Sequence, residues 1–133
     1  MDEEDFTKKF KKGTTTVGVL CSDGVVIGAE KRATMGNLIA NKDIRKIIQI
    51  QPHIGMTIAG SVADAQMVGR ILKAETTLYE IQRKRQITVE SAATLLANVL
   101  QANKYFPYFV QLILAGYDEK PRLYSLDIVG SLL

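Results

Sequence analysis

The run Gly13-Thr14-Thr15-Thr16 is the stretch of this sequence whose residue types could carry out chemistry. A threonine hydroxyl is a weak nucleophile, and the α-amino group of the same residue can activate it as a base once that amine is free. An unperturbed α-amino group has a pKa of about 7.7 to 8.0, so a modest decrease makes it a proton acceptor at neutral pH. The pattern indicates a nucleophile at Thr14, provided that the preceding residues are removed.

The segment before Thr14 has the composition of a removable leader. It contains an acidic block, residues 2–5, and a basic block, residues 8–12, with too little apolar surface to fold alone. Gly13 has no side chain to obstruct attack by the Thr14 hydroxyl on the preceding carbonyl carbon. We therefore expect residues 1–13 to be a propeptide and residues 14–133 to be the mature domain. On this stretch alone, the start of an ordinary β-strand is the better explanation, because threonine and valine favour strands.

Further motifs make the pattern specific, in their spacing as well as their residue types. They are Glu30-Lys31-Arg32-Ala33-Thr34, Arg45-Lys46-Ile47, Thr57-Ile58-Ala59-Gly60-Ser61, Tyr105-Phe106-Pro107-Tyr108, Ala115-Gly116-Tyr117-Asp118 and Ser125-Leu126-Asp127. With Gly13-Thr14-Thr15-Thr16, these motifs resemble the proteasome β-subunit family, and most of all its archaeal form. The resemblance covers everything from Gly13 onward.

The resemblance implies a role for each matching residue. Thr14 would be the nucleophile, and Lys46, with Glu30 as its acidic partner, would lower the pKa of the amine and hydroxyl. Gly60 would donate its backbone N–H to the oxyanion, and Thr34 would hold the substrate in an extended pose. Apolar residues would border the pocket for the residue before the scissile bond, which implies cleavage after hydrophobic residues. They are Ala33, Ile44, Ile48, Ile58 and Val62, with ordinary core as the alternative for Ile48 and Ile58.

The sequence departs from the family pattern in two places. Glu30 stands where the family has aspartate, and its extra methylene moves the carboxylate by about an ångström, which can lower a rate on the order of a hundredfold. Alternatively, Glu30 is a surface carboxylate that pairs with Lys31 or Arg32. The C-terminal serine, aspartate and second serine of the family have no counterpart in the 133 residues. We therefore expect a C-terminally truncated domain that leaves apolar surface uncovered and is inactive by itself.

The resemblance implies a threonine endopeptidase subunit of the 20S proteasome core, a zymogen matured by autocatalytic cleavage and independent of ATP, metal or organic cofactor. Its partners would be other β subunits in seven-membered rings, α subunits, a regulatory ATPase acting through the α ring, and unfolded polypeptide substrates. The alternative is a non-catalytic β subunit that serves ring assembly. A small α+β binding module is a third possibility, but it leaves Gly13-Thr14 and the position of Lys46 unexplained.

Composition and charge narrow the remaining classes of function. The net charge of +3 is spread along the chain, so we expect no nucleic-acid partner, and no apolar run or leader suits a membrane span or secretion. We therefore expect a cytoplasmic protein. The single cysteine, Cys21, excludes an intrachain disulfide, and its neighbours predict a buried thiol. The single histidine, His53, has no partner at metal-ligand spacing and is predicted to be a solvated turn residue.

The elements that position these residues follow from hydrophobic periodicity. Four strands, two helices and two further strands predict an α+β fold in which helices cover one face of an antiparallel sheet. Ser22-Asp23-Gly24 predicts a hairpin turn that uses the conformational freedom of glycine, and 31–41 is predicted to be a polar loop. The resemblance implies the four-layer α/β/β/α sandwich of N-terminal nucleophile hydrolases, incomplete here. The predicted strands are 14–22, 25–30, 47–50, 54–59, 108–117 and 122–129, and the helices are 61–83 and 88–103.

Overall fold

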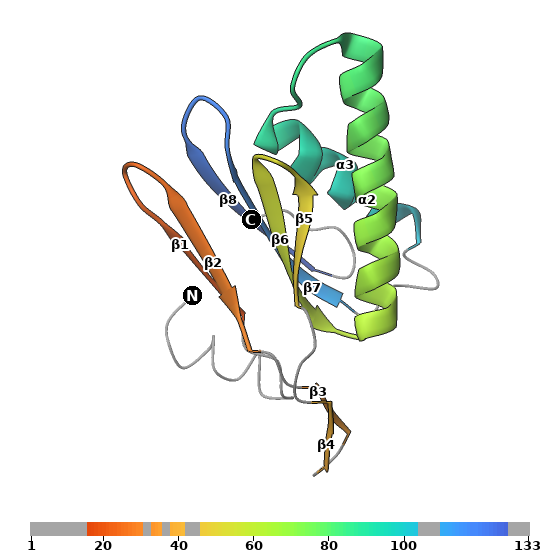
Figure 1. The fold of residues 1–133 in the computed structure, drawn as a ribbon. Helices are drawn as coiled ribbons and strands as arrows, with labels where there is room; N and C mark the ends of the chain where they lie inside the picture. The colour runs from red at the N-terminus through yellow and green to blue at the C-terminus, as the bar shows by residue number, and fades with distance from the viewer. Residues whose placement is uncertain (1–15, 31–32, 36–37, 42–45, 104–109, 128–133) are drawn as a thin grey trace.

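The computed structural model describes residues 16–30, 33–35, 38–41, 46–103 and 110–127. These residues form eight strands and two helices (Figure 1). In chain order the elements are β1 (Thr16–Leu20), β2 (Val25–Ala29), β3 (Ala33–Met35), β4 (Leu38–Asn41), β5 (Ile47–Gln51), β6 (Ile54–Gly60), α2 (Val62–Arg83), α3 (Val89–Ala102), β7 (Val110–Tyr117) and β8 (Pro121–Leu126).

The main sheet is antiparallel, with the strand order β5-β6-β7-β8. The two helices cover one of its faces, and the β1–β2 hairpin lies over the other (Figure 1). A second, separate hairpin joins β3 to β4. The described residues therefore form layers of helix, sheet and sheet, which confirms the predicted α+β class.

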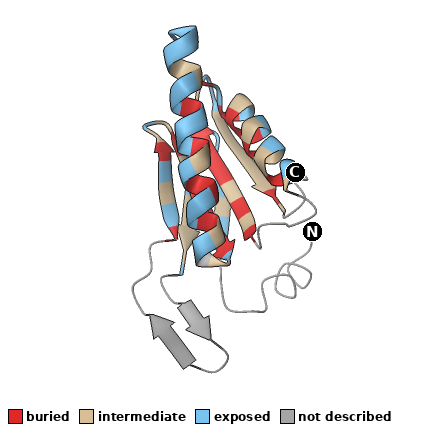
Figure 2. Ribbon diagram, turned by 90° about the vertical axis from the view of Figure 1, so that its right-hand side faces the viewer, coloured by how far each residue is buried: buried red, intermediate tan, exposed pale blue. Residues whose placement is uncertain are grey.

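The hydrophobic core fills the space between the helices and the main sheet (Figure 2). Strand β6 turns Ile54, Met56 and Ile58 toward this core, since alternate residues of a strand share a face. Helix α2 contributes Val68 and Leu72, which are fully buried. The core holds β6 and α2 against each other, and both lead to residues of the predicted site.

Side-chain caps fix where the helices begin, as predicted. The hydroxyl of Ser61 accepts a hydrogen bond from the N–H of Asp64 at 3.3 Å, and the hydroxyl of Thr88 accepts one from the N–H of Ser91 at 3.1 Å. Each of these bonds satisfies a backbone donor that the first helical turn leaves without a partner. At the other end of α2, Lys84 has a left-handed backbone with φ of 53°.

Several local expectations prove wrong. The segment predicted to be a polar loop contains β3 and β4, paired with a register irregularity between Ala33 and Thr34. Cys21 is exposed, because it follows β1 directly and lies in the hairpin turn, where its N–H donates to the carbonyl of Gly24 at 2.8 Å. Gly24 does not use a positive φ; Gly60 is the glycine that does so among the described residues.

His53 lies in the β5–β6 turn, as predicted, and it is half-buried there. Its Nε2–H donates to the carbonyl of Ile87 at 2.6 Å, while Nδ1 is buried and has no hydrogen-bond partner among the described residues. The ring therefore ties the β5–β6 turn to the segment between the helices.

Neither described helix is long and apolar enough to cross a membrane.

Candidate active site

One end of the molecule brings together the ends of four strands (Figure 1). Thr16 pairs with Ala29, so the start of β1 lies beside the end of β2, and Glu30 follows at once. In the main sheet, β5 starts where β6 ends, and the N–H of Ile58 donates to the carbonyl of Lys46 at 2.9 Å. Antiparallel pairing thereby places the predicted residues Glu30, Lys46 and Gly60 at the same end.

The predicted nucleophile lies just beyond the described part of β1. Thr14 and Gly13, with the pocket residue Ile44, are outside the described residues, so their roles stay predictions. We call Glu30, Lys46 and Gly60, together with the start of β1, the strand-end cluster. Thr16, the first described residue of β1, is buried in this cluster.

Lys46 is a buried cation, with only 4% of its surface exposed. Burial lowers the pKa of the Lys46 ammonium, because leaving water disfavours the charged form, and the Glu30 carboxylate opposes this by raising the pKa. Glu30 itself is exposed. A lysine held in this way can lower the proton affinity of a neighbouring amine by charge repulsion, which is the chemistry predicted for it.

Gly60 has a φ of 99°, a backbone conformation that residues with a side chain rarely adopt. It ends β6, and Ser61 caps α2 immediately afterwards, so the chain turns sharply from strand to helix here. Glycine at this position suits both the turn and a close approach of backbone to a bound group. Its predicted function as an oxyanion donor is compatible with this conformation.

The predicted pocket residues fall into two groups. Ala33 and Thr34 belong to β3, where Thr34 pairs with Ile39, and Val62 is the first residue of α2; the side chains of these residues are outside the description. Ile58 is 1% exposed within the core, and Ile48 packs against the same core. Their role beside a substrate stays a prediction.

Thr57 is a polar residue at this site that the sequence analysis did not single out. Its side chain is fully buried, and its hydroxyl finds no hydrogen-bond partner among the residues that the structure describes. The two-residue period of β6 places Thr57 on the face opposite Met56 and Ile58, toward the β1–β2 hairpin. That same period, applied to the sequence, could have distinguished it from its apolar neighbours.

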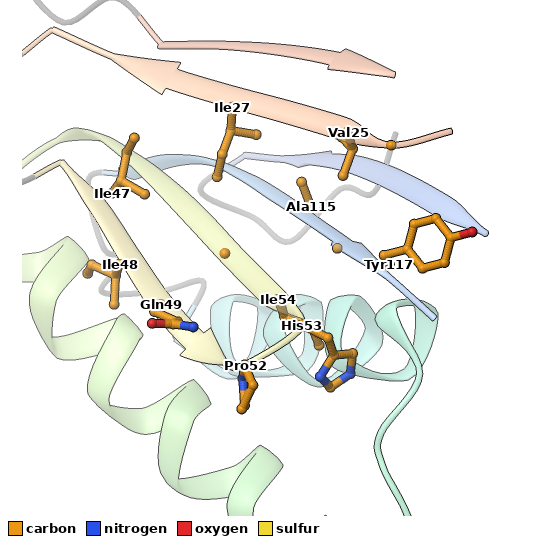
Figure 3. Close-up of a pocket in the computed structure, with 13 residues that line it drawn as sticks. Val25, Ile27, Ile47, Ile48, Gln49, Pro52, His53, Ile54, Ala115 and Tyr117 are labelled. Carbon is orange, nitrogen blue, oxygen red and sulfur yellow. The ribbon is translucent and has the colours of Figure 1, made fainter. Parts of the chain in front are cut away.

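A separate pocket of about 590 Å³ opens along the edge between β2 and the main sheet (Figure 3). Its walls include Val25 and Ile27 from β2, Ile47 from β5 and Tyr117 from β7. The lining contains neither a lysine nor a carboxylate, so it lacks the charged pair present at the strand-end cluster. Within the described part of the chain, no three His, Cys, Asp or Glu side chains are grouped to hold a metal ion.

The fold and the site together define an α+β protein in which two antiparallel sheets face each other and a buried lysine lies where their strands end. The chain belongs to the family described as "Proteasome subunit", whose pattern matches residues 10–133. It is 54% identical over 124 residues to "Proteasome subunit beta" of Archaeoglobus fulgidus, and 54% identical over 120 residues to the protein of that name from Methanospirillum hungatei. The protein of that name from Methanococcus aeolicus is 50% identical over 130 residues.

These alignments cover 90–96% of the chain but only 57–60% of each relative. The chain thus spans somewhat less than two thirds of the length of the curated relatives that it matches. Membership of the family is established by this similarity.

Proposed function

We propose that this chain is a threonine-type endopeptidase β subunit of a 20S proteasome core, with Thr14 as its nucleophile. The observation that carries the proposal is Lys46, a buried lysine with a lowered pKa, next to the Glu30 carboxylate at the end of the fold where β1 begins. Surface lysines have no such environment, and perturbed ionisable groups concentrate at functional sites. Family membership supports the same conclusion.

The proposed reaction uses two groups of the same residue, the α-amino group and the side-chain hydroxyl of Thr14. The free α-amino group of Thr14 accepts the hydroxyl proton while the oxygen attacks the substrate carbonyl carbon, and the proton then passes to the departing amine. The resulting ester is hydrolysed by a water molecule that the same amine deprotonates. Lys46 keeps the amine neutral at working pH, and the Gly60 N–H stabilises the oxyanion, where one donor contributes on the order of 3 kcal/mol.

Maturation is proposed to use the same nucleophile. The Thr14 hydroxyl attacks the carbonyl carbon of Gly13 within the precursor, and the Gly13–Thr14 peptide bond breaks to leave an ester on the Thr14 oxygen and a free α-amino group. Water then hydrolyses the ester, which releases residues 1–13 as a propeptide and leaves a mature domain from residue 14. Until this step the α-amino group is tied up in a peptide bond, so the precursor is a zymogen. Self-cleavage therefore reports on the nucleophile before any external substrate is supplied.

Cleavage after hydrophobic residues is part of the proposal. The five residues assigned to the pocket are apolar, and a charged side chain in such a pocket would lose hydration without gaining a partner. Thr34 is proposed to hold the substrate backbone as an added strand. Within this proposal, β subunits form seven-membered rings enclosed by α subunits in the cytoplasm, and an ATPase delivers unfolded polypeptide through the α ring.

A non-catalytic β subunit that serves ring assembly is the second candidate. Glu30 favours it, because glutamate stands where the family pattern has aspartate and its side chain is exposed. The two candidates differ in what happens at the N-terminus. A chain that keeps Met1 after assembly would support the assembly role.

The experiment compares Thr14→Ala with the parent, each expressed from the complete reading frame and assembled with its α subunits. The parent should begin at Thr14 by mass measurement and hydrolyse fluorogenic peptides faster after leucine than after arginine or glutamate. Thr14→Ala should keep its leader and lose about a thousandfold or more in kcat, because the nucleophile is absent. Ser22→Ala, which removes an exposed hydroxyl in the β1–β2 turn, is the control and should match the parent.

Two results would contradict parts of the proposal. Undiminished hydrolysis by assembled Thr14→Ala would remove Thr14 as the nucleophile. Equal turnover of the leucine and arginine peptides by the parent would remove the hydrophobic preference while leaving the nucleophile in place.

A further inference from the structure

Gly69 lies in the interior of helix α2, where glycine is an unfavourable residue. It is buried on the face that covers the main sheet, together with Val68 and Leu72. Glycine in a helix interior is less stable than alanine, because it loses more backbone freedom on folding and covers no apolar surface. The backbone of Gly69 is helical, so no positive φ requires a glycine there. The reason for this glycine therefore lies in the space around it.

The space beside Gly69 is filled by the end of the Ile48 side chain. A Cβ at position 69 would lie 3.0 Å from Cδ1 of Ile48 and 3.7 Å from Cε of Met56. Ile48 extends from β5 toward α2 (Figure 3). Non-bonded carbon atoms pack at about 3.5–4.0 Å, so an added methyl group would displace Cδ1 by about half an ångström. We call the gap that Gly69 leaves in the surface of α2, and that Cδ1 of Ile48 fills, the helix niche.

Ile48 connects the helix niche to the proposed peptidase site. Its side chain packs against the core but is only half-buried, so it has a core side and an open side. Ile48 follows Lys46 by two residues, and an extended chain places such residues on the same face. The open side of Ile48 is therefore on the face of β5 that also carries the buried lysine.

The packing of the core determines which way Ile48 can move. Met56 pairs with Ile48 across the sheet and is fully buried, so the core side of Ile48 is occupied. A close-packed interior does not accept an extra methyl group without a shift of its neighbours. An alanine at position 69 would therefore push Ile48 toward its open side.

We propose that Gly69 determines the substrate specificity of the proposed peptidase. By keeping Ile48 in the helix niche, it leaves the pocket deep enough for large apolar side chains, such as leucine and phenylalanine, before the scissile bond. Gly69 acts through Ile48, so it is a positioning residue and has no contact with the substrate. The inference rests on the proposed function, because it requires Ile48 to border the substrate.

The test uses the mature particle, expressed from the complete reading frame and assembled with its α subunits. Two peptides are compared that differ only in having leucine or alanine before the scissile bond. Gly69→Ala should lower the leucine-to-alanine ratio of kcat/KM about tenfold, because a difference of one methylene in an apolar pocket has an effect of this size. KM for the leucine peptide should rise with little change in kcat, since the pocket binds substrate and transition state alike. A particle that is merely destabilised would lose activity toward both peptides equally.

Ile48→Val is the second variant, because valine lacks the Cδ1 atom that occupies the helix niche. Alone, it should leave the leucine-to-alanine ratio unchanged, since Cδ1 points into the helix and away from the substrate. Combined with Gly69→Ala, it should restore the parent's ratio, because the colliding atom is absent. If Gly69→Ala alone does not assemble, the same combination should restore assembly. Gly24→Ala is the control, because its added methyl group meets nothing within 4 Å.

Three results would overturn the proposal. They are an unchanged ratio in Gly69→Ala, a changed ratio in Ile48→Val alone, and a double variant that recovers neither the ratio nor the assembly of the particle. Each of these results leaves the proposed nucleophile in place, because the parent still cleaves after leucine. A parent particle without peptidase activity would instead remove the proposed function, and this inference with it.

Discussion

At the scale of single residues, Lys46 shows how a strand end can create a chemical environment. Its carbonyl takes part in the pairing with β6, so the backbone holds the side chain in a buried position. Burial lowers the pKa of the ammonium and Glu30 raises it, so the two effects set the charge on Lys46 between them. Glu30 is therefore the residue through which the pH dependence of the proposed reaction can be changed.

Glu30→Gln should shift the alkaline limb of the kcat/KM profile to lower pH in the assembled, mature particle. The substitution removes the negative charge that raises the pKa of Lys46, so Lys46 loses its proton at a lower pH. The positive charge that lowers the pKa of the Thr14 hydroxyl is then lost at a lower pH. Glu30→Asp keeps the charge and should leave the alkaline limb at the parent's pH. An unshifted alkaline limb in Glu30→Gln would show that Glu30 does not control the charge on Lys46.

Gly116→Ala should destabilise the fold by about 1–3 kcal/mol or more, whereas Gly24→Ala should be nearly neutral. A Cβ at position 116 would lie 2.5 Å from the carbonyl oxygen of His53 and 2.8 Å from Val89, and the backbone oxygen cannot move aside cheaply. A Cβ at position 24 meets nothing within 4 Å. Urea unfolding of both variants measures the difference in stability. Equal midpoints would contradict the prediction, because they would show that the β5–β6 turn moves to accommodate the added Cβ.

Residue types alone did not determine the environment of single side chains. The motif around Lys46 identified a lysine that proves to be buried near a carboxylate. The apolar neighbours of Cys21 suggested burial, but the turn places the thiol in solvent. His53 looked like a turn residue with nothing to bind, and its partner, the Ile87 carbonyl, is 34 residues away in the chain. Such a contact exists only once the helices have packed.

At the scale of elements, Asp118 connects the β7–β8 turn to the start of α3. Its carboxylate accepts hydrogen bonds from the N–H of Val89 at 3.0 Å, of Glu119 at 2.6 Å and of Lys120 at 3.4 Å. It also pairs with Arg122 at 3.0 Å. Burial would raise the pKa of Asp118, but the bonds from Val89, Arg122, Glu119 and Lys120 outweigh it and lower the pKa to about 2.

Asp118→Asn should reduce the free energy of unfolding by about 1–3 kcal/mol at pH 7, since hydrogen bonds to a charged group are lost. The folded pKa lies below the ordinary value of 3.8, so the contribution is fully present above that value and disappears as pH falls toward 2. The gap between the variant and the parent should therefore close near pH 2. Denaturant unfolding between pH 2 and pH 7 measures it, with Glu119→Gln as an exposed control; a gap independent of pH would contradict the assignment.

The capping residues made the two helices predictable from the sequence. Strands β3 and β4 have no comparable local signal, and they were not predicted. Ser61 and Thr88 are local signals, because each bonds to an N–H three residues later. Strands β3 and β4 are short and pair with each other across a register irregularity. With only three and four residues, they are too short for a two-residue period to be recognised in the sequence.

At the scale of the whole molecule, the order of strands and helices was enough to predict the α+β class. The order does not give the sheet partners: β6 pairs with β7 across both helices, and β1–β2 remains a separate hairpin over the main sheet. Those long-range pairings decide that Glu30 and Lys46 share one end. Before the fold was known, only the resemblance to a family could place them together.

Strand β6 passes into helix α2 with Ser61 as the sole residue between them. This junction contains no slack, since Gly60 is held at a φ of 99° and the Ser61 cap closes the first turn of the helix. With only Ser61 between strand and helix, the backbone angles of Gly60 and Ser61 would have to absorb any tilt of the helix on the sheet. We therefore expect the direction of the Gly60 amide, proposed to receive the oxyanion, to depend on how α2 packs.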